Sequence, residues 1–177
     1  MSEVLICPSC NNIYEKDKIV KNEHGIYICP NKKDIYDDSL LIPVDENLAD
    51  TVLKFINLGI MTTHCCEGHP HSGSDPYIVF AEELDNPSSS LSLQELYDLC
   101  IEINKELDNF WDISKINEGK KIIPFRFYKT KCSYFVLRTI TPHKEFIYLN
   151  VVERLELKLK FIKSLELLIE RIGKKLK

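Results

Sequence analysis

The cysteines near the N-terminus constrain the fold of this chain more than any other feature. Cys7 and Cys10 are separated by two residues, the first of which is Pro8, and Cys29 follows after a further 18 residues. A Cys-x-x-Cys turn brings two sulfurs to the same side of the chain, where both can bind one zinc ion. Residues 1–33 contain few large apolar side chains, so a metal is the usual means by which so small a segment becomes stable.

The fourth ligand of this zinc site is less obvious. A complete zinc ribbon would have another cysteine three residues after Cys29, but the sequence has Lys32 there. His24, five residues before Cys29, is the nearest candidate. Alternatively, a later loop that folds back could supply the fourth ligand. A further alternative is that the segment is a degenerate zinc ribbon that no longer binds zinc. The predicted metal ligands are Cys7, Cys10, Cys29 and His24, and the candidates in the later loop are Cys65, Cys66 and His69.

Composition limits the kind of environment in which the chain is expected. The N-terminus lacks the basic patch and apolar run of a signal peptide, and no apolar stretch is long enough to cross a membrane. We therefore predict a cytoplasmic protein without a membrane partner. Thiols stay reduced in that compartment, so the seven cysteines are expected to serve as metal ligands, reactive thiols or core residues rather than as disulfides.

Charge is distributed unevenly along the sequence. Residues 34–118 hold 18 acidic side chains and three lysines, a net charge of −15, whereas residues 119–177 hold 15 basic side chains and five glutamates, a net charge of +10. The two segments can attract each other in the folded protein. Alternatively, the basic segment can bind an anion such as a nucleotide or RNA.

Hydrophobic periodicity predicts an α+β fold with a mixed, partly antiparallel sheet and two or three helices. A zinc-ribbon-like module is expected over residues 1–39, and an α+β domain over residues 40–177. Ser92 and Glu95 form a capping box that starts one of the helices. The predicted strands cover residues 40–44, 60–66, 77–81, 122–128 and 134–140, and the predicted helices cover 45–59, 92–110 and 151–172.

The segment from His64 to His71 combines three histidines, two cysteines and a glutamate in eight residues. Four interpretations remain open. Cys66 and His69 could bind a metal, or a cysteine thiolate could act as a nucleophile with a histidine as its base. The turn that Gly68 permits could instead bind a ligand through Gly68 and His69. The fourth interpretation is an irregular loop without a ligand.

A basic hairpin could complete a binding site with this loop. Arg126 and Tyr128 alternate along one predicted strand, and Arg138 lies on the next. Arginine and aromatic side chains on one face suit a phosphate or a base, although the same arginines could pair with acids of the middle segment. Trp111 is expected in the core. The predicted ligand-binding residues are Thr63, His64, Cys66, Gly68, His69, Arg126, Tyr128 and Arg138.

A longer pattern contains the His- and Cys-rich loop. It reads Asn57-x-Gly59-x-x-Thr62-x-x-Cys65-Cys66-x-Gly68-His69, followed by Tyr77-Ile78-x-Phe80. This pattern resembles uncharacterised bacterial and phage proteins with a CC-x-GH…YI-x-F signature. It is also distantly similar to the methyltransferase family of wybutosine synthesis in tRNA, in which a Thr-rich strand leads into a Ser-Cys-Ser-Gly-Arg loop. Cys66-Glu67-Gly68 matches the Cys-x-Gly core of that loop, and His69 stands in place of its arginine. The resemblance covers residues 45–82. It implies use of S-adenosylmethionine and a tRNA substrate.

Together these features favour a zinc-containing protein that binds a nucleotide or an RNA-like anion. Because a composition rich in Lys, Asn and Ile is typical of low-GC bacteria and their phages, one hypothesis is a phage protein that sequesters a nucleotide signal or inhibits a host defence protein. One alternative is the tRNA-modifying methyltransferase that the resemblance implies. Another is a protein-interaction module whose C-terminal helix pairs with a partner or with a second copy. The sequence has no P-loop, GxGxxG or HExxH motif, and catalytic residues are not assigned.

Overall fold

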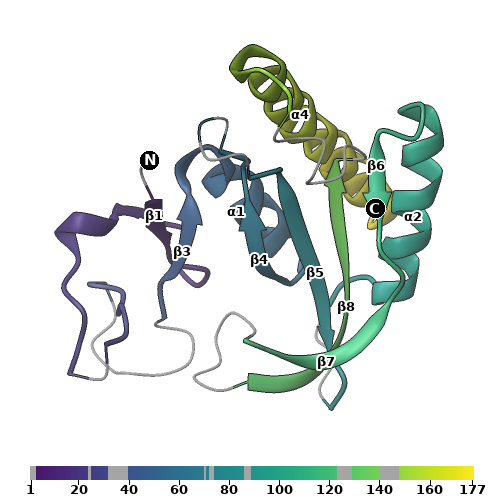
Figure 1. Cartoon of the computed structure of the whole chain (residues 1–177). Helices are drawn as coiled ribbons and strands as arrows, with labels where there is room; N and C mark the ends of the chain where they lie inside the picture. Colours follow the sequence, from purple (N-terminus) through teal and green to yellow (C-terminus); the bar gives the residue numbers. More distant parts are fainter. Residues whose placement is uncertain are drawn as a thin grey trace.

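The computed structural model describes residues 3–23, 25–31, 40–69, 71, 74–85, 89–122, 129–139 and 148–177. Three α-helices and two sheets make up these parts of the chain (Figure 1). Every strand pair within the described residues is antiparallel. The predicted α+β fold class is therefore confirmed.

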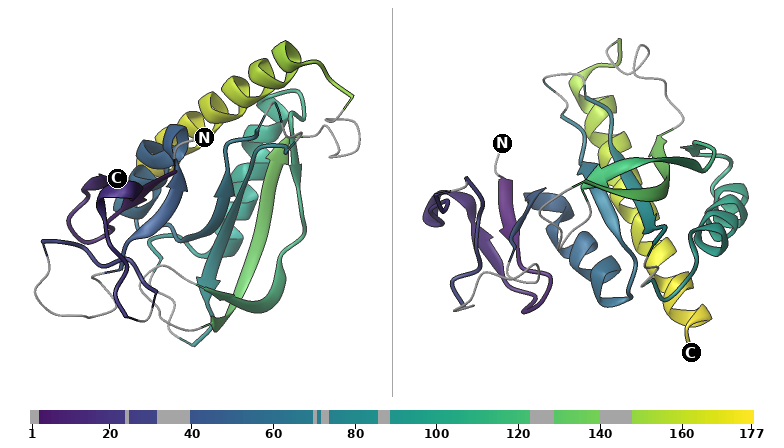
Figure 2. Two further views of the ribbon diagram at one scale, coloured as in Figure 1. Left: turned by 60° about the vertical axis from the view of Figure 1, so that its left-hand side comes forward. Right: turned by 90° about the horizontal axis from the view of Figure 1, so that it is seen from below.

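The smaller sheet lies at one side of the molecule, next to the first helix (Figure 2). The side chains on the two faces of its central strand, β1, belong to two different apolar clusters. Leu5 packs with Cys7 and Cys29, whereas Val4 and Ile6 join the main core. The strands, in the spatial order β2-β1-β3, are β1 (Glu3–Ile6), β2 (Ile13–Glu15) and β3 (Ile42–Asp45), with the 3-10 helix η1 (Lys16–Lys18) after β2.

The larger sheet has the order β4-β5-β8-β6, and β7 also pairs with β8. Side chains alternate between its two faces. The face that carries Ile78, Phe80, Phe135 and Leu137 belongs to the main core, and we call it the inner face. The opposite face is the outer face. The strands are β4 (Thr62–Cys66), β5 (Tyr77–Glu83), β6 (Trp111–Ile113), β7 (Asn117–Ile122) and β8 (Lys129–Thr139).

The helices contribute apolar side chains to the main core with the inner face. Two of them begin with capping boxes, one of which joins Ser92 and Glu95 as predicted, while the other joins Asn150 and Glu153. The segment after Asp45 differs from the expectation, because its first turn is a 3-10 helix. The helical segments are η3 (Glu46–Leu48), α1 (Ala49–Asn57), α2 (Leu93–Glu106) and α4 (Val151–Lys175).

Aromatic side chains form the centre of the main core. The ring centroids of Phe55 and Phe80 lie 5.1 Å apart, and those of Phe80 and Phe135 lie 5.4 Å apart. Trp111 is almost fully buried, as expected, and its indole N–H donates a hydrogen bond of 2.8 Å to Ser164 Oγ on α4. This bond gives the polar atom of the ring a partner, which burial of an indole requires.

The predicted arrangement of strands in residues 111–140 was partly wrong. The predicted turn at residues 129–131 lies inside β8, while β6 and β7 were not predicted. Asn117-Glu118-Gly119-Lys120-Lys121 is polar and contains a glycine, so it lacks the apolar alternation by which strands are recognised. It is a strand because it pairs with β8. Of the strand predicted at residues 122–128, Ile122 is the last residue of β7, and residues 123–128 lie outside the described residues.

Charge complementarity joins the acidic middle segment to α4. Lys158, Arg171 and Lys175 of α4 form ion pairs with Glu67, Glu106 and Glu95 respectively. The basic side chains of the C-terminal segment therefore serve in part to neutralise the middle of the chain. No helix of the described residues is both long enough and apolar enough to cross a membrane.

Candidate metal centre and ligand-binding face

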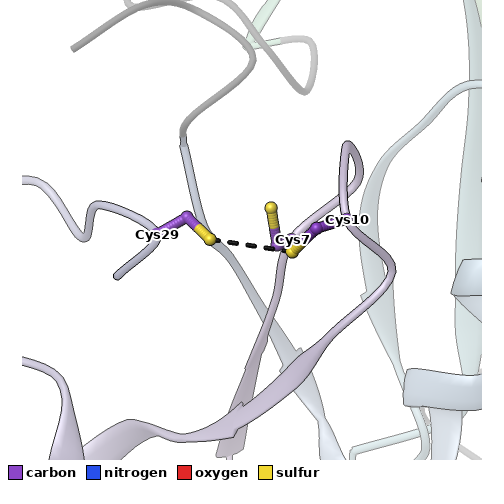
Figure 3. A group of neighbouring side chains, drawn as sticks. All are labelled: Cys7, Cys10 and Cys29. Carbon is purple, nitrogen blue, oxygen red and sulfur yellow. Dashed lines mark hydrogen bonds between the residues drawn. The ribbon is translucent and has the colours of Figure 1, made fainter. Parts of the chain in front are cut away.

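Cys7, Cys10 and Cys29 form a cluster that could hold a metal ion, and we call it the thiolate centre (Figure 3). Their sulfur atoms all lie within 4.8 Å of one another, and the sulfurs of Cys10 and Cys29 are 3.7 Å apart. Two sulfurs bound tetrahedrally to one zinc ion at about 2.3 Å would lie roughly 3.8 Å apart. The spacing of Cys10 and Cys29 therefore suits one tetrahedral ion.

A tight turn after β1 positions the first two sulfurs. The N–H of Asn11 bonds the carbonyl oxygen of Cys7 at 2.8 Å, and the N–H of Cys7 bonds the carbonyl oxygen of Asn12 at 2.9 Å. Asn11 has a φ of 58°, a left-handed conformation that asparagine tolerates better than most residues. The N–H groups of Cys10 and Asn12 also bond the sulfurs of Cys7 and Cys10. Such N–H donors stabilise thiolates and orient them for a metal.

The electrostatic environment differs among the three thiols. Burial raises the pKa of Cys7 above its ordinary value. Burial acts in the same direction on Cys10, but hydrogen bonds from Asn12 and from neighbouring side chains outweigh it and lower the pKa of Cys10 to about 7. The Tyr14 hydroxyl lies 3.3 Å from the sulfur of Cys29. Burial and this sulfur raise the pKa of Tyr14, so the phenol stays neutral and can donate to a thiolate.

The structure limits the candidates for the fourth ligand. His24 lies outside the described residues, so its predicted role remains a prediction. Cys66 and His69 lie close to Asp45, which pairs with Glu3 at the start of β1. Because Cys7 follows the other end of β1, four residues of strand separate the two places by roughly 13 Å. These loop residues are therefore not within reach of the thiolate centre.

Cys65 and Cys66 lie on opposite faces of the larger sheet. Cys65 packs against the main core, whereas Cys66 pairs with Tyr77 and faces outward. Burial raises the pKa of Cys65 to about 12 and that of Cys66 to about 11. The nucleophile interpretation requires a lowered pKa, and the pKa of each of these thiols is shifted in the opposite direction.

The turn after Cys66 depends on Gly68, as the sequence indicated. Gly68 has a φ of 83°, and a Cβ atom there would lie 2.9 Å from Cδ of Pro76. Any larger residue would therefore be strained and would also collide with Pro76. After this turn, the N–H of His69 bonds the carbonyl oxygen of Ser74 at 2.8 Å. Gly68 thus has a conformational role that accounts for its presence.

The predicted ligand-binding residues divide into two groups. Cys66 and His69 lie beside Asp45, and the His69 Nε2 atom is 3.7 Å from Asp45 Oδ2. His64 and Arg138 lie on the outer face, where Cys66, Tyr77 and Arg138 are neighbours across β4, β5 and β8. Thr63 lies at an irregularity in β4, with its hydroxyl 3.2 Å from His64 Nδ1. Arg126 and Tyr128 lie outside the described residues.

Two residues of the outer face were not recognised in the sequence. The ammonium of Lys121 lies 4.3 Å from the ring centroid of Tyr134, and this ring covers Gly119. Partial burial lowers the pKa of His64, and the positive charge of Lys121 lowers it further, so the imidazole is neutral near pH 7. No motif marks Lys121 or Tyr134, because the pairing of β7 with β8, and not the local sequence, brings these two residues together.

Arg138 has one acidic neighbour within the described residues. Its Nε atom lies 4.0 Å from Asp112 Oδ2, and both side chains are substantially exposed. An exposed pair at this distance contributes little to stability. The guanidinium therefore keeps most of its capacity to bind another anion.

Comparisons of the chain with models of protein families, with curated proteins and with solved structures found no match.

Proposed function

We propose that this protein binds zinc at the thiolate centre and a nucleotide or RNA-like anion on the outer face of the larger sheet. The observation that carries the proposal is the arrangement of Lys121, Tyr134 and Arg138 with His64 on that face. Cationic groups beside aromatic rings are the combination that binds phosphates and stacks bases.

Zinc is the metal that best suits the thiolate centre. Soft thiolate ligands favour zinc over magnesium, calcium and manganese, which prefer oxygen. Cys7 and Cys29 are almost fully buried and belong to the apolar cluster with Leu5. Ligand sets composed mainly of cysteine are typical of structural zinc sites. We therefore assign the thiolate centre the role of holding residues 3–31 together.

The dimensions of the outer face suit a small anionic ligand. Tyr134 and Arg138 lie four residues apart on β8, a separation of roughly 13 Å between their backbones. Their side chains can shorten this span, so one nucleotide could place its base against Tyr134 and a phosphate near Arg138. Lys121, beside Tyr134, would bind a second phosphate or the backbone of a longer strand.

Replacement of Arg138 by alanine is expected to weaken nucleotide or RNA binding by about 1.5–3 kcal/mol, the range for hydrogen bonds to charged groups. Arg138→Lys should restore little, because a point charge does not reproduce the two parallel bonds of a guanidinium. Titration of a nucleotide panel and a short RNA, each at two salt concentrations, measures the effect. Higher salt should weaken RNA binding more steeply than mononucleotide binding.

Lys175→Ala is the matched control for this experiment, because Lys175 lies on α4 near Glu95, away from the outer face. It removes one positive charge from the chain and should leave binding unchanged. If Arg138→Ala and Lys121→Ala both bind like the wild type, the outer face is not the binding site. Equal losses in all three variants would mean that only net charge matters.

The biological use of such binding is a further hypothesis. Sequestration of a nucleotide signal would require tight binding without turnover, and inhibition of a host defence protein would require a protein partner. The methyltransferase alternative predicts saturable binding of S-adenosylmethionine. The same titration, extended to S-adenosylmethionine, separates that alternative from simple nucleotide binding.

Self-association through α4 is a second candidate function, and a specific pattern favours it. Exposed apolar side chains follow one another at spacings of three and four residues near the start of this helix. This is the spacing of a coiled-coil seam, which a second copy of the same helix can complete. The residues of this seam are Val152, Leu155 and Leu159.

Val152→Glu combined with Leu159→Glu is expected to convert a dimer into a monomer, because the seam would then bury like charges. Light scattering coupled to size-exclusion chromatography measures the mass at several concentrations. Lys174→Gln is a suitable control, since it alters an exposed charge of the same helix far from the seam. A wild-type chain that is monomeric at every concentration would contradict self-association.

A further inference from the structure

Asp45, Cys66 and His69 form a second group of metal-ligating side chains, and we propose that they constitute a second zinc site. We call this group the mixed site. It is independent of the thiolate centre and does not depend on the proposed anion binding. One ligand atom of each residue lies within 4.8 Å of the others. The three residues come from the end of β3, the end of β4 and the turn that follows β4.

The positions of the ligand atoms are close to those that a zinc ion requires. His69 Nε2 and Asp45 Oδ2 are 3.7 Å apart, and the two side chains are 14% and 13% exposed. Nitrogen and oxygen ligands on one tetrahedral zinc ion would lie roughly 3.3 Å apart. A small inward movement of either side chain would therefore bring both atoms to bonding distance. Cys66 is buried on the outer face beside them.

The backbone holds these side chains in place through hydrogen bonds. The N–H of Glu67 donates a bond of 3.0 Å to Asp45 Oδ2, and the N–H of Gly68 bonds the sulfur of Cys66. Backbone N–H groups that donate hydrogen bonds to metal-ligating side chains orient these side chains for the metal. Gly68 and Pro76 fix the path of the turn that brings His69 back towards Asp45.

Glu67, which follows Cys66 in the sequence, has partners of its own. Its carboxylate accepts a bond of 2.5 Å from Lys158 Nζ on α4 and a bond of 3.2 Å from the N–H of Asn47. These contacts attach the turn to both α4 and the segment after Asp45. They preserve the geometry of the three ligands without using Glu67 as a fourth.

The ligand types indicate zinc and an open coordination position. A thiolate, an imidazole and a carboxylate together suit zinc, which accepts sulfur, nitrogen and oxygen ligands. Three protein ligands leave one tetrahedral position for water or for an oxygen of an anion. Because Cys66, Tyr77 and Arg138 are neighbours across three strands, an anion bound there would approach the outer face.

The wild-type chain is expected to bind about two zinc ions, one at each site, with tetrahedral ligation at both. Elemental analysis of protein purified without chelator measures this number. Asp45→Asn, Cys66→Ser and His69→Gln should each reduce it by about one ion, because an incomplete ligand set binds zinc much more weakly. Cys7→Ser with Cys10→Ser should remove the other ion and leave the mixed site loaded.

Matched controls distinguish ligands from their neighbours. Cys65→Ala replaces the adjacent cysteine on the inner face, and His71→Gln replaces an exposed histidine two residues after His69. Both should retain the wild-type zinc content. Circular dichroism of each variant shows whether it is folded, and Asp45→Asn keeps an oxygen that can accept the Glu67 N–H.

Cobalt reconstitution gives a second measurement that does not depend on any single variant. The wild-type apoprotein should bind about two Co²⁺ ions with the intense visible bands of tetrahedral ligation. In Cys7→Ser/Cys10→Ser, the remaining cobalt should retain thiolate absorption, which Cys66→Ser then removes. If the Cys7→Ser/Cys10→Ser chain binds no cobalt, or if zinc content survives in all three mixed-site variants, the proposal is wrong.

Discussion

A chain with serine at both Cys7 and Cys10 is expected to lose the zinc ion of the thiolate centre and to unfold over the segment from Cys7 to Cys29, which carries its ligands. Structural zinc sites contribute apparent binding free energies of about 10–16 kcal/mol at pH 7, and this free energy is coupled to folding. The four buried members of the apolar cluster there, which include Leu5 and Leu41, are too few to replace it. Elemental analysis, thermal melting and limited proteolysis measure the metal, the stability and the exposed segment.

The unfolding should end at β1, because this strand also contributes to the main core and pairs with β3, which carries Asp45 of the mixed site. Val4 and Ile6 pack in the main core with Val44. Cys100→Ala with Cys132→Ala is the control, since both of these cysteines are buried elsewhere. That variant should keep its zinc even if it is less stable. Equal zinc content in wild type and Cys7→Ser/Cys10→Ser would refute the assignment of the thiolate centre.

Lys158→Met is expected to lower the free energy of unfolding by about 3–5 kcal/mol, the typical cost of removing one partner of a buried ion pair. Glu67 and Lys158 are only 9% and 13% exposed, and 2.5 Å separates their charged atoms. Methionine preserves the length of the side chain but leaves the carboxylate of Glu67 without its counter-charge. Urea denaturation followed by circular dichroism measures the loss.

The double variant Glu67→Gln/Lys158→Met separates the cost of an uncompensated charge from the cost of lost packing. Removing both charges should recover most of the stability, because paired removal of a buried ion pair is often nearly neutral. Lys174→Met is the exposed control, since its pair with Glu170 lies at the surface. A double variant as unstable as Lys158→Met would show that the charge is not the cause.

Local sequence signals predicted the elements whose formation depends on near neighbours. The capping box at Ser92, the long C-terminal helix and the strands on either side of the His- and Cys-rich loop are present close to their expected positions. Each depends on residues within one or two turns, or on a run of β-favouring side chains. By contrast, β6 and β7 depend on pairing with β8, and their own residues do not indicate a strand.

The two candidate metal sites also differ in whether local sequence or tertiary structure brings their ligands together. Cys7 and Cys10 were identified from spacing alone, because two residues between cysteines already bring their sulfurs together. Asp45 was interpreted only as the start of a helix. It lies 21 residues before Cys66, and no spacing rule connects the two. Their proximity results from the positions of β3 and β4 relative to each other.

The sequence by itself therefore determined the pairing of Cys7 with Cys10, the helix start at Ser92 and the turn at Gly68, since covalent spacing and local conformation are sufficient for these. Only the tertiary structure placed Asp45 beside Cys66 and His69, and Lys121 beside Tyr134. It also paired Glu67 with Lys158 of α4, 91 residues away in sequence. Such contacts depend on which strands pair and on which face of the sheet a helix covers. Strand pairing and helix placement are both determined by burial of the whole apolar core.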